Sequence, residues 1–439
     1  MLQNVKVLFV SRDLPLPNTY GMGAYVLSLV RHLRRTGCEI EYVVLGIANN
    51  APGWIVPAEL DAVCHVVVDR GIRLGPHILL SLSNPMWWLI APLKYAYLNY
   101  LPEEIRQRYK KFKRWLRPPP SGPRPEAGKA FPPQVAPPAG PEIEFFVERY
   151  AMFEPDVIIV NHAWLAEIFR FLPGANRVVR VVLAPDIMHQ RRADFEAHGL
   201  HAGFGDWDRE IEQAFLSNAE VILAIQEHDA QVLRQMLPER EVICAPIAIS
   251  VHQISGAVQV PGRCLFVGSY VDHNVVGLNW FLETVWPIIL ARDPDATLHV
   301  CGEVCKSVTG QFGQVRLLGR VENLDEEYGA AEVCLVPLHV GSGLKIKLVQ
   351  ALSYGRVCVS TSVGVQGLPE IGQAGVSVAD TATDFADAVH ALLSDSERRV
   401  SMQQQAQQYV EAMFAPEVVF TTFSNRILEH VRGQSVPSG

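Results

Sequence analysis

The sequence lacks an uninterrupted apolar run long enough to cross a membrane. No run approaches the roughly 18–20 consecutive apolar residues that a transmembrane helix needs. The first residues, MLQNVKVLFVSRD, also lack the basic segment and the cleavage site of a signal peptide. We therefore expect a cytoplasmic protein, or one that at most touches the inner face of a membrane.

Cysteine and histidine are present, but not in the arrangements that bind metals. Eight cysteines are scattered through the chain, mostly within apolar segments. Cys301 and Cys305 lie four residues apart, but no second pair accompanies them at zinc-site spacing. The 14 histidines contain no HExxH motif. We expect buried free thiols of a reducing compartment, no metal and no other cofactor.

Other absences exclude further classes of protein. The chain has 38 basic and 46 acidic residues, a net charge of −8, which argues weakly against non-specific nucleic-acid binding. No GxGxxG motif is followed by an acidic residue about 20 positions on, which argues against a dinucleotide oxidoreductase. The hydrolase motif GxSxG is also missing.

What the chain does contain is a repeated alternation of strand-length apolar runs with amphipathic helical patterns. Its 439 residues predict two or three domains. The predicted strands are 5–11, 39–46, 156–161, 178–185 and 220–226 in the first half, and 264–269, 296–302, 315–321, 332–338 and 356–361 in the second. This alternation is typical of parallel sheets with crossover helices. We expect an α/β protein with one Rossmann-like domain at 1–248, a second at 262–415, and a terminal helix at 416–433 that returns to the first domain.

One segment interrupts this pattern. From Pro118 to Pro141, ten of 24 residues are proline, which predicts a disordered or polyproline-like insertion in the first domain. Just before it, residues 103–117 carry seven basic and two acidic side chains interleaved with apolar and aromatic ones. Such a helix can lie on an anionic membrane. A solvated helix on the flank of the domain is an equal alternative, and a nucleic-acid patch is a third.

The segment LVPLHVGSGLKIKLVQALSYGRVCVST, residues 335–361, holds the strongest candidate site. A strand ending at Leu338 is followed by Gly341 and Gly343 and then by a predicted helix. Free amides at a helix start favour an anion, and glycine lets a ligand approach the backbone. Lys345 and Lys347 are two residues apart, so at most one of them fully faces the loop. An ordinary tight turn with surface lysines is the alternative.

The residues beyond this loop favour the anion site. GSGLKIKLVQALSYGRVCVSTSVGVQGL resembles the donor-binding segment of retaining glycosyltransferases of the GT-B fold, and within them glycosyltransferase family 4. The similarity extends over roughly 262–380 and includes LFVGSYVDHNVVGLNWFLETVWP and DATLHVCGE. The first domain resembles the family more loosely, through GMGAYVLSLVRHLRRTG and PDVIIVNHAW.

The resemblance implies a nucleotide-diphosphate sugar as donor and two Rossmann-like domains that face each other across a cleft. It also implies roles for single residues. Gly21 and Gly23 would face the donor phosphates from the first domain, and His162, or Asn161 in its place, would lie near the reacting sugar. Lys347 would neutralise the diphosphate and serve with His162 in catalysis. The remaining implied donor contacts are Gly268, Glu303, Ser342, Gly343, Lys345 and Gln350.

Two residues depart from the family pattern. The acidic residue that commonly accepts hydrogen bonds from the ribose is Gln350 here, which can accept only through a neutral carbonyl oxygen. The arginine often found after the FVG strand is missing, because Ser269 and Tyr270 follow Gly268. The two lysines would then carry more of the phosphate charge.

The acceptor is expected on the first domain. The segment APDIMHQRRADFEAHG places Asp186, His189 and Arg191 after a predicted strand end, where ligands collect in parallel sheets. A plain solvated loop is the alternative. We expect a metal-independent glycosyltransferase that acts on a glycan or lipid-linked acceptor in envelope or extracellular polysaccharide synthesis. The rival hypotheses are a catalytically weakened binding or scaffold protein, and a sugar-nucleotide epimerase.

Overall fold

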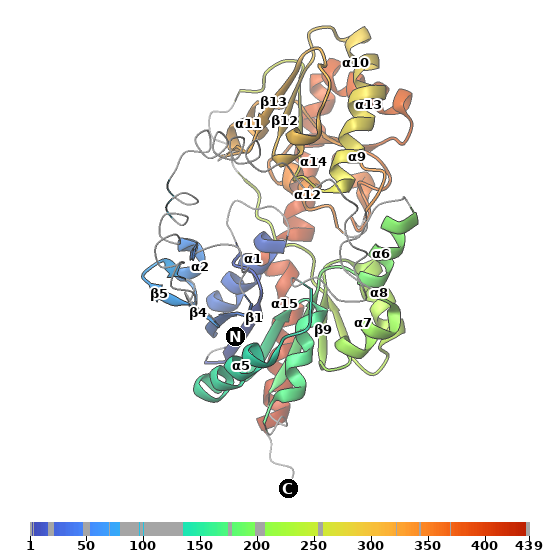
Figure 1. Cartoon of the computed structure of the whole chain (residues 1–439). Helices are drawn as coiled ribbons and strands as arrows, with labels where there is room; N and C mark the ends of the chain where they lie inside the picture. The colour runs from blue at the N-terminus through green and yellow to red at the C-terminus, as the bar shows by residue number, and fades with distance from the viewer. Residues whose placement is uncertain are drawn as a thin grey trace.

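The computed structural model describes residues 2, 4–15, 22–46, 53–69, 71–79, 96, 100, 135–173, 178–197, 207–252, 258–321, 323–341, 344–368 and 370–435. These residues form two parallel α/β domains, stacked one above the other in Figure 1. Residues 103–117, most of the proline-rich segment, Gly21, Ser342 and Gly343 lie outside the described residues.

The first domain is built on a seven-stranded parallel sheet in the order β10-β9-β8-β7-β1-β2-β4. Its strands are β1 (Lys6–Ser11), β2 (Glu39–Val44), β4 (His65–Val68), β7 (Val157–Asn161), β8 (Val179–Ala184), β9 (Val221–Ala224) and β10 (Glu241–Cys244). The central strands are nearly continuous apolar runs because helices cover both faces of the sheet.

The helical elements of the first domain are α1 (Met22–Arg35), α2 (Ala58–Asp61), α5 (Gly140–Phe153), η1 (Ala163–Phe171), α6 (Met188–Ala197), α7 (Arg209–Leu216) and α8 (Glu227–Met236). A separate three-stranded antiparallel sheet joins β3 (Gly53–Ile55), β5 (Ile72–Leu74) and β6 (His77–Leu79) in the order β3-β6-β5. The proline-rich segment ends earlier than its composition predicts, because Gly140 and Pro141 already belong to α5, and proline fits the first turn of a helix.

The second domain contains a six-stranded parallel sheet in the order β13-β12-β11-β14-β15-β16. Its strands are β11 (Arg263–Val267), β12 (Thr297–Cys301), β13 (Val315–Gly319), β14 (Val333–Val336), β15 (Val357–Ser360) and β16 (Val376–Val378). Its helical elements are α9 (Asp272–Trp280), η2 (Phe281–Val285), α10 (Trp286–Arg292), η3 (Glu303–Ser307), α11 (Asp325–Ala330), α12 (Ile346–Ser353), η4 (Ile371–Gln373), α13 (Ala382–Ser394) and α14 (Ser396–Phe414).

One helical stretch is long and apolar enough to cross a membrane by length and composition alone. It runs from Asp272 to Arg292 through α9, the π-helical turn η2 and α10, and 44% of its tested window is buried. Its apolar side chains, among them Phe281, Val285 and Trp286, pack in the core of the second domain. It is therefore a core helix of this domain.

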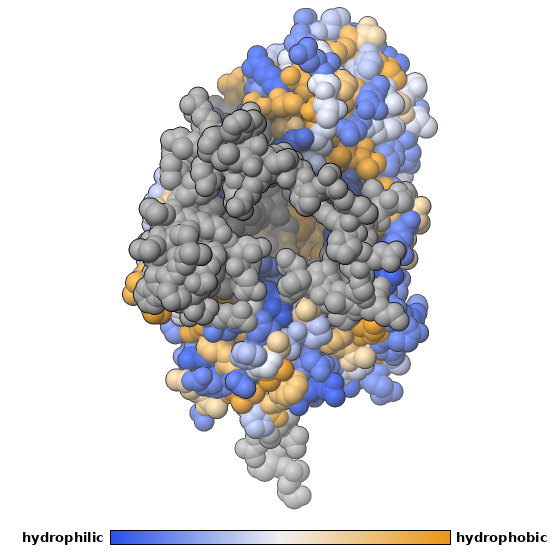
Figure 2. Space-filling model, viewed as in Figure 1, coloured by the Kyte–Doolittle hydropathy of each residue, from blue (hydrophilic) through white to orange (hydrophobic). Residues whose placement is uncertain are grey.

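The chain crosses back to the first domain after α14. Helix α15 (Pro416–Ser435) packs against α1, and Phe420 and Phe423 lie in the apolar core that α1 also enters. Figure 1 shows α15 running beside the sheet of the first domain to the C-terminus. His32 of α1 and Ser424 of α15 are joined by a hydrogen bond of 2.9 Å. On the face shown in Figure 2, described hydrophilic and hydrophobic residues are interspersed over both domains.

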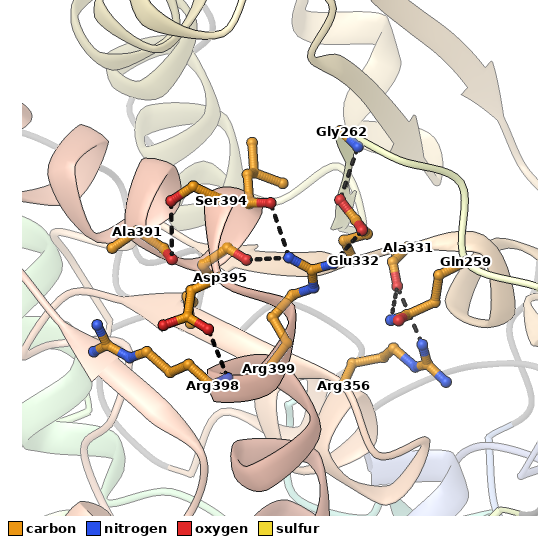
Figure 3. Close-up of polar contacts among 12 residues, drawn as sticks. Gln259, Gly262, Ala331, Glu332, Arg356, Ala391, Ser394, Asp395, Arg398 and Arg399 are labelled. Atoms are coloured by element: carbon orange, nitrogen blue, oxygen red, sulfur yellow. Dashed lines mark hydrogen bonds and ion pairs between the residues drawn. The ribbon is translucent and has the colours of Figure 1, made fainter.

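A buried ion pair ties the helices of the second domain to its sheet (Figure 3). Arg399 of α14 pairs with Glu332, just before β14, at 2.5 Å, with side chains 9% and 7% exposed. Arg399 also donates to the carbonyls of Leu392 and Leu393 at the end of α13, while Glu332 accepts from the Gly262 amide at 2.7 Å. All eight cysteines are free, and six are buried.

Candidate active site

A cavity of about 520 Å³ lies between the two domains, where strands of both sheets end. The residues that follow β7, β8 and β9 line it from one side, and those that follow β11, β12 and β13 line it from the other. The carboxyl ends of parallel strands are the usual place for ligands in such sheets. The first domain contributes Met22, His162, Pro185, Asp186, Arg191, Phe195 and Ile225. The second contributes Val267, Gly268, Ser269, His273, Asn274, Cys301, Gly302, Glu303, Arg320, Val321, Leu324, Gly341, Leu344, Lys345, Ile346 and Lys347.

The close approach of two strand ends forms one wall of the cavity. Gly302 has φ +103°, and a Cβ on it would lie 2.1 Å from the carbonyl oxygen of Gly268. Only glycine fits there without moving the backbone. Glu303 follows Gly302, lines the cavity and pairs with Lys306.

Lys347 points into this cavity from the first turn of α12. It donates a hydrogen bond to Asn274 Oδ1, and its Nζ lies 5.3 Å from the centre of the Phe266 ring. Burial lowers the pKa of Lys347 to about 7, and the neighbouring charge of Lys345 acts in the same direction. An anion placed beside this lysine would favour its charged form.

Lys345 lies just before α12 and is 6% exposed. It donates to the carbonyl of Gly341 at 2.9 Å. Burial lowers its pKa to about 8, although the carboxylates of Asp186 and Asp229 act against this shift. Gly341 has φ +119°, which a non-glycine residue would adopt only with strain.

His162 directly follows β7 and lines the cavity. Its φ is +81°, and its ring stacks on Trp164 with centroids 4.2 Å apart. Burial, together with the nearby charge of Arg191, lowers the pKa of His162 to about 3, so the ring is neutral near pH 7. Asn161 is 4% exposed, donates to Ser11 Oγ at 3.2 Å and does not line the cavity. Of the two residues considered for this place, His162 is the one at the cavity.

The predicted acceptor residues separate into two groups. Asp186 and Arg191 both line the cavity and pair at 2.5 Å. Burial raises the pKa of Asp186, and the guanidinium of Arg191 opposes that shift. His189 does not line the cavity: its Nδ1 lies 2.7 Å from Glu212, whose carboxylate also accepts from the amides of Met188 and His189. His189 therefore anchors the start of α6.

The remaining donor candidates also lie in different places. Gly268 lines the cavity, whereas Gly23 lies within α1, and its neighbour Met22 is the lining residue. Gln350 is 6% exposed in α12, outside the lining, and its Oε1 has no hydrogen-bond partner among the described residues.

Several lining residues are missing from the sequence-based set, among them the polar residues His273, Asn274 and Arg320. His273 lies at the start of α9 with its Cβ 3.6 Å from the position of a Cβ on Gly341. Burial lowers its pKa to about 3, with contributions from three nearby cations. Asn274 donates to Ser269 at 2.9 Å and accepts from Lys347, and Arg320 follows β13. The polar sequence SYVDHN after the FVG strand is the signal that would have identified the first two.

Within the described residues, no group of three or more histidine, cysteine or acidic side chains is placed to hold a metal ion. The charged groups of the cavity are instead four cations, Arg191, Arg320, Lys345 and Lys347, and two carboxylates, Asp186 and Glu303. With both lysines protonated, the excess of two positive charges suits a ligand that carries a diphosphate.

Comparison with protein families gives a match for the second domain. Residues 261–395 match the family described as Glycosyl transferases group 1. A relative from Klebsiella pneumoniae, named as an uncharacterized 44.6 kDa protein in the cps region, is 30% identical over 115 residues. The alignment spans 24% of this chain and 30% of the Klebsiella protein, so the chain covers less than a third of this curated relative.

Solved structures resemble the whole chain. Sucrose-phosphate synthase from Thermosynechococcus elongatus superposes with a TM-score of 0.62 at 15% identity, over 98% of this chain and 100% of the other. TarM from S. aureus gives 0.64 at 9% identity, over 96% and 99%. HepE from Anabaena, solved with UDP and glucose, gives 0.57 at 12% identity, over 97% and 100%. These similarities confirm the predicted α/β fold of two Rossmann-like domains facing each other across a cleft.

Proposed function

We propose that the chain is a family 4 glycosyltransferase, because residues 261–395 match the family described as Glycosyl transferases group 1, and that it moves a sugar from a nucleotide-diphosphate sugar to a glycan or lipid-linked acceptor with retention of configuration. The observation that carries this proposal is the interdomain cavity, whose basic side chains outnumber its carboxylates. Among the described residues, Lys347 hydrogen-bonds to the neutral amide of Asn274 and has no carboxylate partner. HepE, a structural neighbour, was solved with UDP and glucose, which supports a nucleotide sugar as donor.

Departure of the nucleotide requires stabilisation of a diphosphate. In this chain Lys347 would supply a charge-assisted hydrogen bond from the start of α12, worth about 1.5–3 kcal/mol. His273 and Asn274 flank it and would complete the phosphate pocket. Because these groups are fixed before the donor arrives, they stabilise the developing charge without reorganising.

His162 would contact the transferred sugar from the first domain. Its lowered pKa keeps the ring neutral near pH 7, so it acts as a hydrogen-bond partner and not as a cation. Its positive φ and its stacking on Trp164 fix the ring direction. We propose that Asp186 and Arg191 form the acceptor wall on the same side.

The acceptor is proposed to belong to an envelope or extracellular polysaccharide. The similarity to a protein of a Klebsiella cps region supports this proposal. The basic, aromatic segment 103–117 would bring the protein to a membrane that carries the acceptor. The test is a chain without residues 103–134, a deletion that removes none of the described residues. It should lose binding to anionic liposomes in flotation, and unchanged flotation would end the membrane proposal.

A panel of UDP-, GDP- and ADP-sugars read by thermal shift tests the donor assignment. At least one nucleotide class should raise the melting temperature of the wild-type protein, and Lys347→Met should abolish that rise. Arg292→Met is a matched control, because it removes a cation from the same domain at an exposed pair with Asp387. No stabilisation by any nucleotide sugar, or equal stabilisation of Lys347→Met, would contradict the assignment.

Gln350 favours one alternative, a catalytically weakened protein that binds partners. Its unpartnered Oε1 is an acceptor that a ribose hydroxyl could satisfy, but without the charge of the usual carboxylate. Gln350→Glu separates the two functions when donor turnover is measured. Robust turnover by the wild-type protein refutes the weakened role, whereas turnover that arises only in Gln350→Glu supports it.

A further inference from the structure

The two lysines at the start of α12 differ in their surroundings, because only Lys345 is stabilised by carboxylates of the first domain. Lys347 interacts with Asn274 and Phe266, both from the second domain. Lys345 is held by the carbonyl of Gly341 at 2.9 Å. The carboxylates that stabilise its charge all come from the first domain: Asp186, Asp229 and Asp194.

A hydrogen bond between the domains continues from this lysine. The amide of Gly341, whose carbonyl accepts from Lys345, donates to Asp194 Oδ2 of α6 at 3.2 Å. Lys345, Gly341 and Asp194 therefore form one chain of contacts that crosses the cleft. Arg191 and Phe195 of the same helix line the cavity, so α6 connects this crossing to the proposed acceptor wall.

Asp229 provides a second anionic group on the first-domain side. It is 3% exposed, accepts from Gln226 Nε2 at 2.6 Å, and its Oδ2 has no hydrogen-bond partner among the described residues. Gln226 in turn lies against the second domain, because a Cβ on Gly367 would come within 2.2 Å of Gln226 Oε1. The carboxylate is thus buried at the contact between the domains.

These groups depend on one another electrostatically. Burial raises the pKa of Asp229 to about 6 and lowers that of Lys345 to about 8, and each opposes the shift of the other. If the domains moved apart, Lys345 would lose three carboxylates and Asp229 would lose a cation. The attraction between Lys345 and these carboxylates therefore opposes separation of the domains, while burial of the same groups acts in the other direction.

We propose that Lys345, Asp194 and Asp229 form an electrostatic latch between the two domains, in which Lys345 positions the glycine loop against the first domain. In the second part of the proposal, Lys347 is the only one of the two lysines that contacts the donor diphosphate. The second part rests on the proposed function, whereas the first part concerns the protein without any ligand. Lys345 is in this sense a positioning residue.

The test compares Lys345→Met, Lys347→Met, Asp229→Asn and the double variant Lys345→Met/Asp229→Asn, with Arg292→Met as the surface control. Small-angle scattering of the ligand-free proteins reports domain separation, and calorimetry with UDP, GDP and ADP reports nucleotide affinity. Lys345→Met and Asp229→Asn should each increase the radius of gyration, and the double variant should add little to either. Circular dichroism confirms that each variant is folded.

Nucleotide affinity then distinguishes the lysines. Lys347→Met should lose at least about tenfold in affinity, and Lys345→Met less than about threefold, since its charge is already compensated by carboxylates. Hydrolysis of the donor sugar, which needs no acceptor, should fall about tenfold or more in Lys345→Met because the closed geometry is lost. An unchanged radius of gyration together with equal affinity losses for the two lysines would overturn the latch. If the wild-type protein binds none of the three nucleotides, the proposed function fails, while scattering still decides the latch.

Discussion

At the scale of single residues, the site depends on charges that the protein has removed from water before any ligand is present. Lys347 is the clearest example, because burial lowers its pKa to about 7 from the ordinary 10.5 and its hydrogen-bond partner is a neutral amide. A diphosphate would restore the charged form, so ligand binding and protonation are coupled at this side chain.

We therefore expect nucleotide binding to take up a proton above pH 7. Calorimetry in buffers of different ionisation enthalpy measures the number of protons, which should approach about one near pH 8. Lys347→Arg is the matched control, because a guanidinium stays charged throughout this range and takes up no proton. Equal proton uptake by the wild-type protein and Lys347→Arg would show that another group titrates.

Gly302 allows a second prediction, about stability and nucleotide affinity. Gly302→Ala places a Cβ 2.1 Å from the Gly268 carbonyl at a φ of +103°, so the ends of β11 and β12 must separate. We expect a loss of about 1–3 kcal/mol from the backbone conformation alone, with the clash adding to it. Chemical denaturation measures the change, and nucleotide affinity should fall as well.

Gly319→Ala is the control for Gly302→Ala. Its φ of +67° is also positive, but a Cβ there meets no atom within 4 Å. It should destabilise the protein by about 1–2 kcal/mol and leave nucleotide affinity unchanged. If the two variants lose the same stability and affinity, close approach at Gly302 is not what shapes the cavity wall.

At the scale of elements, the sequence predicts the strands that carry the site better than those at the edges. All ten predicted strands correspond to strands of the two parallel sheets, and most of them are buried, near-continuous apolar runs, whereas β13 is largely exposed. The strands β4, β10 and β16 were not predicted. All three lie at sheet edges and are only three or four residues long.

The site residues show a different limit. Gly268, Glu303, Lys345, Lys347, His162, Asp186 and Arg191 follow strand ends or begin helices, and the structure brings them to one cavity. The pattern alone did not show that His189 turns toward Glu212, or that Gln350 is buried away from the lining. Side-chain direction depends on partners that are distant in sequence, which periodicity does not encode.

The Glu332–Arg399 pair gives a prediction about how elements are held together. Glu332→Ala leaves Arg399 buried without its carboxylate and removes the acceptor of the Gly262 amide. We expect a loss of about 3–5 kcal/mol in the free energy of unfolding, measured by urea denaturation.

Asp387→Ala tests the same kind of change at the surface. It removes a carboxylate from an ion pair with Arg292 whose side chains are 52% and 38% exposed. Its effect should be at most about 1 kcal/mol. Similar losses for Glu332→Ala and Asp387→Ala would contradict the view that burial of the Glu332–Arg399 pair is what matters.

At the scale of the whole molecule, the chain crosses between the domains twice in ways that fix their contact. The segment after β10 is hydrogen-bonded to α14 and α12 of the second domain. The amide of Ile249 donates to the carbonyl of Phe414, and the amide of His252 donates to the carbonyl of Ser353. His252 also stacks on Tyr354, which stacks on Tyr328. The second crossing, from α14 to α15, starts at the same Phe414, so the two connections lie next to each other.

The docking of α15 on α1 should make stability depend on pH. His32 is 8% exposed, and burial lowers its pKa below the ordinary 6.5, with Arg35 acting in the same direction and Glu417 against it. The unfolded chain therefore binds more protons than the folded one, so this contribution is fully present above pH 6.5 and is lost as the pH falls below it.

His32→Gln can keep a hydrogen bond to Ser424 without titrating. Between pH 7 and pH 5 the wild-type protein should lose more unfolding free energy than His32→Gln, as measured by urea denaturation at each pH. Parallel pH curves for the two proteins would show that this histidine does not link α15 docking to protonation.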